Sequence, residues 1–294
     1  MKKLFGLLFL IIFFEAGAQK TDKSLQKQIE ALVAGFHGEV GIYVHDLERN
    51  RIAFYHADTL FSTASIVKIP IMIGIMDKIQ RHELEFHQAI QYQDTLNYNP
   101  GEDVLASFKP DQKILLSKLM LLSISLSDNT ASLLLQSLAG GGLRINQLMD
   151  SLGYPLTRVN SRTPGREPER EKYGWGQTTP REIARLVEQI SYGQILSQAS
   201  SDRMLRTLGR QYWDEVALSQ IPPNVFVASK HGSLDDCRNE VLYVNAPHAY
   251  VFSIFTKNNA DKSWEYGNEA WVLIRKLSAL LFKYYNPTVH WETK

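Results

Sequence analysis

The chain has 294 residues, of which 44% are apolar and 21% are charged, and its formal net charge is +1. This length allows one large or two ordinary domains with a sizeable hydrophobic core. A charge balance so close to neutral argues against nucleic acid or an anionic membrane surface as the main partner.

The N-terminal residues differ from the rest of the chain. Lys2–Lys3 is basic, Leu4–Phe14 is apolar, and Ala16–Ala18 offers small residues for cleavage. This order is typical of a secretory signal peptide over residues 1–18, with Gln19 as the first mature residue. The apolar run is too short for a permanent membrane span, although a retained N-terminal anchor is the alternative. We therefore expect a periplasmic protein, secreted across the inner membrane, with no stable membrane anchor.

Cys237 is the only cysteine. A single cysteine cannot form an intramolecular disulfide, so the stability of an exported chain must come from its core. No His or Asn context points to the thiol as a nucleophile. We interpret Cys237 as structural or incidental.

The mature chain begins with a helix and a hairpin. Leu25–Phe36 has apolar residues at helical spacing, and two runs rich in β-branched and aromatic residues, Glu39–Leu47 and Ile52–Tyr55, are separated by a polar turn. From Ser65 to Arg210 the pattern is mainly helical. Loops are expected at Asn97–Asp103 and Gly140–Gly142.

The second half starts with a long irregular stretch, Val159–Thr178, of the kind that is usually functional or mobile. Thr179 and Pro180 then begin another helix, as N-cap and first helical residue. Four further elements follow, three strands and a closing helix: Val225–Lys230, Glu240–Asn245, Tyr250–Thr256 and Asn268–Tyr285.

This order of elements predicts an α+β fold, an α/β sandwich. Its antiparallel sheet is built from both chain ends and packed with the terminal helices, and an all-helical domain is inserted. We expect residues 19–64 and 211–294 to form the sheet domain and residues 65–210 the helical domain. A site in such a fold lies in the seam between the two parts.

The run Ser65–Ile79 carries the first candidate chemistry. On a helix, Lys68 lies one turn after Ser65 on the same face, within reach of the serine hydroxyl. The rest of the run is almost wholly apolar, so Lys68 should be buried and driven toward its neutral form, which a general base needs. Such a lysine activates a serine nucleophile. The alternative is a helix-capping serine followed by a snorkelling lysine.

Two further polar groups follow in order, Ser127-Asp128-Asn129 and Lys230-His231-Gly232-Ser233. Ser-x-x-Lys, then Ser-Asp-Asn, then Lys-x-Gly resembles the penicillin-recognising serine hydrolases, specifically the class A β-lactamase family. The similarity covers nearly all of the mature chain. It also includes Phe61, Ala64, Lys68-Ile69-Pro70 and Thr178-Thr179-Pro180.

The resemblance implies catalytic roles. Ser65 would attack the substrate carbonyl and be acylated, and Lys68 would take its proton. Ser127 would relay a proton to the leaving nitrogen, with Lys230 keeping its hydroxyl polarised. The backbone N–H groups of Ser65 and Ser233 would form the oxyanion hole.

It also implies a substrate-binding set. Asn129 would hold the amide side chain of the substrate, while His231, Gly232 and Ser233 would lie with Lys230 beside its carboxylate. The partner is then a small-molecule β-lactam or a peptidoglycan peptide, with no cofactor and no metal, and the protein is expected to be a monomer.

Two positions depart from the family pattern. His231 stands where the family has Thr or Ser; an imidazole is larger and can be charged near pH 6.5, so it could bind an anion or obstruct the site. The family also clears its acyl-enzyme with a loop glutamate, in the motif Glu-Pro-x-Leu-Asn. Here Glu167-Pro168 keeps only the first two residues, and an ungapped register places Thr163 at the glutamate position.

Glu167 is therefore the tentative base for deacylation. In the ungapped register it takes the place of the water-holding asparagine, so its carboxylate could still reach the water. The alternative is that Glu167, Glu169 and Glu171 pair with loop arginines in solvent.

The sequence predicts an exported serine β-lactamase-like hydrolase that opens the lactam amide through a Ser65 acyl-enzyme. One alternative is a D,D-peptidase or penicillin-binding type of serine acyltransferase with slow deacylation. The other is a non-catalytic, ligand-binding relative.

Overall fold

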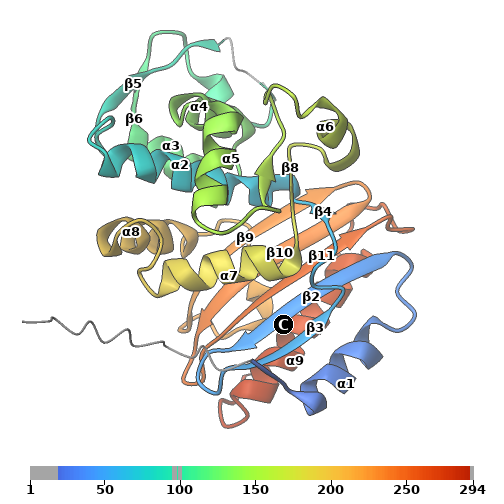
Figure 1. Ribbon diagram of the computed structural model, residues 1–294. Coiled ribbons are helices and arrows are strands. Elements are labelled where there is room, and N and C mark those ends of the chain that lie inside the picture. Colours follow the sequence, from blue (N-terminus) through green and yellow to red (C-terminus); the bar gives the residue numbers. More distant parts are fainter. Residues whose placement is uncertain (1–18, 95–97, 99–100, 292–294) are drawn as a thin grey trace, which may run out of the picture.

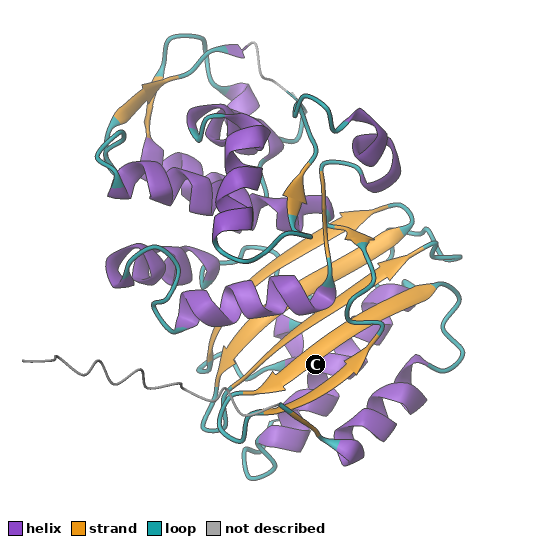
Figure 2. Cartoon of the chain, in the orientation of Figure 1, coloured by secondary structure: helices purple, strands orange, loops and turns teal. Residues whose placement is uncertain are grey.

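The computed structural model describes residues 19–94, 98 and 101–291. It shows a six-stranded sheet with helices on both faces (Figures 1 and 2). The strands come from both ends of the chain and most of the helices from its middle, so the predicted α+β class is confirmed. The predicted signal peptide, residues 1–18, lies outside the described residues.

The sheet has the strand order β1-β3-β2-β11-β10-β9. Neighbouring strands are antiparallel except for β1, which pairs in parallel with β3. The strands are β1 (Lys20–Thr21), β2 (Glu39–Asp46), β3 (Arg51–Tyr55), β9 (Phe226–Leu234), β10 (Cys237–Asn245) and β11 (Tyr250–Lys257).

The two terminal helices cover one face of the sheet. They are α1 (Lys23–Val33) and α9 (Glu269–Tyr285), and their apolar residues share a core with that face. Side chains cap both helices at the N-terminus: Asp22 accepts hydrogen bonds at the start of α1, and Asn268 does so at the start of α9. The Tyr284 hydroxyl also donates to Asp22 at 3.0 Å, which ties the two helices together.

The remaining helices lie on the other face or beyond it (Figure 1). They are α2 (Lys68–Gln80), α3 (Leu116–Ser125), α4 (Asn129–Leu138), α5 (Gly141–Ser151), α6 (Glu167–Tyr173), α7 (Pro180–Ser191) and α8 (Gln198–Leu208). α2 is central because every residue from Lys68 to Met76 is buried. α7 packs directly on β2, β10 and β11, although it falls within the range expected for the helical domain.

Short elements complete the fold. The described residues include the 3-10 turns η1 (Ala64–Val67), η3 (Leu105–Ser107) and η4 (Leu218–Gln220). Five short strands form two small sheets: β4 (Phe61–Ser62), β7 (Arg158–Val159) and β8 (Gly176–Thr178) in one, β5 (Ala89–Gln91) and β6 (Lys113–Leu115) in the other.

Several predicted boundaries were wrong. The expected loop at Gly140–Gly142 is mostly helix, because Gly140 and Gly141, both with positive φ, make the turn and α5 already begins at Gly141. The irregular stretch Val159–Thr178 contains α6 and β8. The strand expected to end at Lys230 continues to Leu234, because its pairing with β10 is unbroken.

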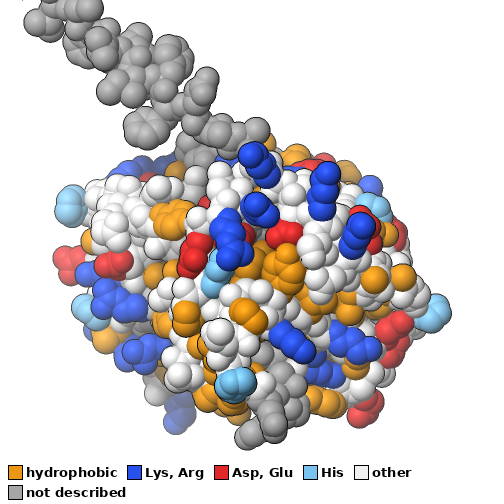
Figure 3. All heavy atoms as spheres, turned by 90° about the horizontal axis from the view of Figure 1, so that it is seen from below, with side chains coloured by type: hydrophobic (Ala, Val, Ile, Leu, Met, Phe, Trp, Pro, Cys, Tyr) orange, Lys and Arg blue, Asp and Glu red, His pale blue; other side chains and the backbone are white. Residues whose placement is uncertain are grey.

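Among the described residues, no helix is both long and apolar enough to cross a bilayer. Figure 3 shows the molecule from below, with side chains of both charge signs and hydrophobic side chains interspersed on that face. This mixture agrees with the formal net charge of +1.

Gly41 of β2 provides a test of how closely the sheet packs against Phe61 and the start of α7. A β-carbon there would lie 2.5 Å from the Phe61 ring and 2.8 Å from Pro180. We expect Gly41→Ala to lower the free energy of unfolding by about 1–3 kcal/mol through overpacking, measured by urea denaturation. Gly267→Ala is the control, because nothing lies within 4 Å of its β-carbon position; equal effects of the two changes would contradict this packing.

Candidate active site

Ser65 lies in a 3-10 turn rather than in the helix proper, which corrects the expectation that the helix begins there. η1 carries Ser65, and α2 begins at Lys68, whose backbone N–H donates to the carbonyl of Ser65. Residues three apart eclipse one another in a 3-10 turn. This geometry brings the Lys68 Nζ to 3.1 Å from the Ser65 Oγ.

Backbone strain precedes the nucleophile. Ala64 has φ of +43°, in the left-handed region that a residue with a β-carbon rarely adopts. Such conformations persist only where the surrounding structure enforces them, and they cluster at functional sites. Here the Thr63 N–H donates to the carbonyl of Gly176 at 2.9 Å, so the strained turn is fastened to β8.

Lys68 is fully buried. Besides Ser65, its amine contacts polar groups where α3 turns into α4. Its Nζ donates to the Ser127 carbonyl, lies 3.0 Å from the Ser127 Oγ and lies 2.8 Å from the Asn129 Oδ1. A neutral amine has two N–H groups and one lone pair. The carbonyl of Ser127 and the amide oxygen of Asn129 can only accept, so they take the N–H groups and leave the lone pair for a serine hydroxyl.

The surroundings also set the protonation of this amine. Burial lowers the pKa of Lys68 to about 7, against the opposing charges of Asp103 and Asp128. A substantial neutral fraction therefore exists near neutral pH. The predicted pairing of a nucleophile with a base thus has both the required distance and the required protonation.

Ser127 lies between two lysines. Its Oγ is 3.0 Å from the Nζ of Lys68 and 3.1 Å from the Nζ of Lys230, which reaches it from β9. Ser127 has φ of +60° and is thus another left-handed residue with a β-carbon. The structure therefore brings together four of the predicted catalytic residues, Ser65, Lys68, Ser127 and Lys230.

Lys230 is also fully buried. Burial, and then the charge of Lys68, lower its pKa well below the ordinary value, while Glu240 opposes the shift. The Lys230 Nζ also donates to the carbonyl of His231 at 2.9 Å. The second amine is thus held in place by an acceptor on its own strand.

β9 lies directly against the nucleophile at Gly232. A β-carbon on Gly232 would be 2.5 Å from the carbonyl oxygen of Thr63 and 2.7 Å from the backbone nitrogen of Ser65. Only glycine permits this approach. Ser233 follows on the same strand, half-buried, so the two backbone segments expected to form the oxyanion hole are adjacent.

His231 is half-buried and faces Glu240 in the register of β9 and β10. Side chains alternate along a strand, so the imidazole lies on the opposite face of β9 from the Lys230 side chain. Burial, followed by the charges of Lys230 and Lys68, lowers the pKa of His231 well below its ordinary value. The imidazole is therefore neutral at neutral pH.

Asn129 is placed by an acidic residue that sequence reasoning missed. The Asp103 carboxylate accepts the backbone N–H groups of Asn129 and Thr130 at 3.0 and 2.9 Å, which satisfies two free donors at the start of α4. The Asn129 Oδ1 then accepts from Lys68. Asp103 carried no sequence signal, since it ends an expected loop.

Glu240 was missed as a site residue too, being expected only as the start of a strand. Its carboxylate is buried and accepts the N–H of Ala217 at 3.1 Å. Burial raises the pKa of Glu240 to about 7, while Lys230 opposes the shift. A buried titratable acid therefore lies beside the strand that carries Lys230.

The structure does not place Glu167 with the other residues. Glu167 begins α6, a helix with no buried residue, and its carboxylate accepts the Gly165 N–H at 3.2 Å. No contact among the described residues joins it to Ser65, Lys68 or Ser127. Its role in deacylation stays a prediction.

Two other residues of this loop, Thr163 and Glu169, also make contacts within the loop. Thr163 is buried, donates to the Ser161 carbonyl at 3.0 Å and lies against α5, where a β-carbon on Gly142 would be 1.7 Å from its hydroxyl oxygen. The Glu169 carboxylate lies 4.0 Å from the Arg166 guanidinium. The expected pairing of a loop glutamate with a loop arginine thus occurs at Glu169.

The lone cysteine has no place in the site. Cys237 is buried at the start of β10, and burial raises its pKa to about 11. A protonated thiol is a poor nucleophile.

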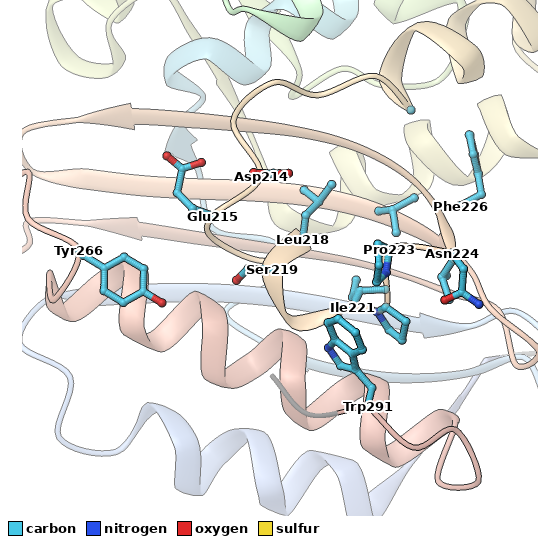
Figure 4. Close-up of a pocket in the computed structure, with 14 residues that line it drawn as sticks. Asp214, Glu215, Leu218, Ser219, Ile221, Pro223, Asn224, Phe226, Tyr266 and Trp291 are labelled. Atoms are coloured by element: carbon cyan, nitrogen blue, oxygen red, sulfur yellow. The ribbon is translucent and has the colours of Figure 1, made fainter. Parts of the chain in front are cut away.

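A separate pocket of about 770 Å³ lies between the loop before β9 and the C-terminal segment (Figure 4). Its lining is largely apolar, with Leu218, Ile221 and Trp291 among its residues, and it includes none of the predicted site residues. In the part of the chain that the structure describes, no group of three or more His, Cys, Asp or Glu side chains could hold a metal ion.

Comparison with known proteins agrees with this geometry. The model of the Beta-lactamase enzyme family matches residues 24–285. The chain is 24% identical over 228 residues to the β-lactamase CTX-M-97 of Escherichia coli, covering 76% of this chain and 77% of that protein. It is 23% identical over 242 residues to the β-lactamase SME-1 of Serratia marcescens, covering 78% of each.

Solved structures share the fold. PBP-A superposes with a TM-score of 0.79 at 23% identity, covering 92% of this chain and 98% of that one. A variant of PBP-A, described as an acyl-enzyme complex with penicillin G, gives the same score at 24% identity. A class A β-lactamase from Bacteroides cellulosilyticus has a TM-score of 0.78 at 20% identity, covering 90% and 97%.

The protonation of Lys68 can be measured directly. We expect the ε-methylene carbon of Lys68, followed by NMR in the folded protein, to titrate with a midpoint of about 7. Because Asp103 raises this pKa through its charge, Asp103→Asn should move the midpoint lower. Asp202→Asn, on α8, is the control and should leave it unchanged. A midpoint near that of a free lysine would contradict the site described here.

Proposed function

Because the chain belongs to the Beta-lactamase enzyme family, we propose that it is a serine hydrolase that opens the β-lactam amide through an acyl-enzyme on Ser65. One observation carries the proposal: a buried amine, with its pKa lowered to about 7, lies 3.1 Å from the Ser65 Oγ. A non-catalytic ligand-binding protein would need neither this activated nucleophile nor a base poised near neutral pH.

The acylation step follows from these contacts. Neutral Lys68 accepts the proton of Ser65 as the Ser65 Oγ bonds to the lactam carbonyl carbon. Negative charge develops on the carbonyl oxygen, and the backbone N–H groups of Ser65 and Ser233 are the donors proposed to stabilise it. The close approach at Gly232 supports this role, because it brings β9 against the backbone of Ser65.

Ser127 completes the step. Its hydroxyl gives its proton to the leaving nitrogen as the C–N bond breaks, and it regains a proton from Lys68. The two lysines lie 3.0 and 3.1 Å from the Ser127 Oγ, which supports this relay. Asn129 and the segment His231–Ser233 are proposed to hold the substrate.

A second candidate function is a D,D-peptidase or penicillin-binding type of acyltransferase that releases its acyl group slowly. The observation in its favour is the loop. Thr163 is buried against α5, and Glu167 is exposed at the start of α6. Among the contacts of the described residues, none joins Thr163 or Glu167 to Ser65, which supports slow release of the acyl group.

We also propose that the protein is exported to the periplasm and acts as a monomer on a small β-lactam or a peptidoglycan peptide. The composition of residues 1–18 supports export.

The two candidate functions differ in turnover. After mixing with a chromogenic cephalosporin, sustained colour with little labelled protein supports the hydrolase. One stoichiometric burst with a stable adduct on Ser65, detected by intact-protein mass, supports the slow acyltransferase. Ser65→Ala should abolish the adduct, and a label that survives this change would remove the proposed nucleophile.

The role of Glu167 can be tested in the same assay. A positioned base contributes about 10²–10⁴-fold, so loss of the deacylating base would lengthen the lifetime of the acyl-enzyme by about that factor. We expect Glu167→Gln to leave the lifetime unchanged, because the carboxylate is exposed and bonded to Gly165. Glu171→Gln, on the same exposed helix, is the matched control. A lifetime that lengthens only in Glu167→Gln would establish Glu167 as the base.

A further inference from the structure

The segment after α8 touches the turn that carries Ser127. The backbone N–H of Tyr212 donates to the Ser125 carbonyl at 3.1 Å. The indole N–H of Trp213 donates to the Leu126 carbonyl, also at 3.1 Å. A helix leaves its last carbonyls without intrahelical partners, and α3 ends at Ser125. Two of these acceptors are thus satisfied by residues 87 positions further along the chain.

The turn needs such support because Ser127 is strained. A residue in the left-handed region after a helix is usually glycine, and a residue with a β-carbon persists there only where its surroundings enforce the conformation. Lys68 donates to the carbonyl of Ser127, and the Asp128 N–H donates to the Leu122 carbonyl at 3.1 Å. Both of these contacts are made by the peptide after Ser127, whereas Trp213 bonds the peptide before it, at the Leu126 carbonyl.

We propose that Trp213 is a positioning residue for proton delivery by Ser127, an inference that rests on the proposed function. Its indole N–H orients the Leu126–Ser127 peptide, and this peptide sets the direction of the Ser127 side chain. The hydroxyl has to stay within hydrogen-bond distance of both lysines. Proton transfer depends steeply on such geometry.

The chemistry of the leaving group gives a specific readout. In lactam acylation the Ser65 Oγ–C bond forms, the C–N bond breaks, and the nitrogen must receive the proton that Ser127 donates. Ser127 is restored by the proton that Lys68 took from Ser65, so the protons balance. A thioester acylates Ser65 in the same way but expels a thiolate, a far weaker base than an amide nitrogen because thiols have a pKa of about 8.5, so it leaves without a proton from Ser127 and Lys68 keeps the proton of Ser65.

The test is Trp213→Phe, which keeps an aromatic ring and removes the N–H donor. The readout is the acylation rate with a penicillin divided by the acylation rate with an acyl thioester. We expect this ratio to be about tenfold lower in Trp213→Phe than in the unmodified protein, because only the reaction with the penicillin needs the proton from Ser127. Both rates are read as the adduct mass on Ser65. Because the readout is a ratio, any loss of folded protein lowers both rates equally and leaves the ratio unchanged.

Trp264→Phe is the matched control. Trp264 also donates its indole N–H to one acceptor, the Asp235 Oδ1 at 3.0 Å, and it is 58% exposed compared with 46% for Trp213. Its ratio should equal that of the unmodified protein. An unchanged ratio in Trp213→Phe overturns this inference alone, whereas an unmodified protein that gains no adduct from either reagent overturns the proposed function and this inference with it.

Discussion

The burial of the Lys68 amine is the constraint on which the site depends. A charged ammonium in a dry interior costs several kcal/mol, and the protein reduces this cost by lowering the pKa of Lys68 to about 7. The apolar residues of α2 are what exclude water. The same residues that build the core of the helical part therefore lower the pKa of the amine that we propose as the base.

A second buried amine adds a further constraint. The charge of Lys68 helps to lower the pKa of Lys230. The state in which both amines are charged is therefore unfavourable. The Ser127 hydroxyl lies between the two amines, so it can accept a hydrogen bond from one amine and exchange a proton with the other. The buried acid Glu240, with a pKa of about 7, lies beside the strand of Lys230 and offsets part of its positive charge.

The strained residues follow from this arrangement. Ser65 and Ser127 approach one amine from two different segments, and Ser127 lies 59 positions from Lys68 in the sequence. Ala64, before Ser65, and Ser127 itself adopt left-handed backbone conformations. Neighbouring elements hold both: β8 bonds to Thr63, while Trp213 and Lys68 bond to the turn at Ser127. Strain at the site is thus balanced by hydrogen bonds from well-packed parts of the fold.

The sequence predicted the long elements and the fold class, because the periodicity of α9 and the β-branched runs of β2 and β11 are local signals. It also predicted, through the order of three short motifs, that Ser65, Lys68, Ser127 and Lys230 would meet. It did not predict the 3-10 turn at Ser65, the continuation of β9 past Lys230, or the helix α6. These depend on pairing and packing between distant segments, as with the contact of Trp213 to the Leu126 carbonyl, which no local pattern encodes.

The loop at 159–178 is where the motif reading was least informative, and its packing shows why. Gly142 leaves room for Thr163, whose hydroxyl turns toward α5 and the Ser161 carbonyl. α6, by contrast, buries none of its residues, so the core does not fix where the Glu167 carboxylate points. The proposed acylation step uses an amine that the core holds in place. The proposed deacylation step would use a carboxylate of this loop, and the core does not hold that of Glu167 in place.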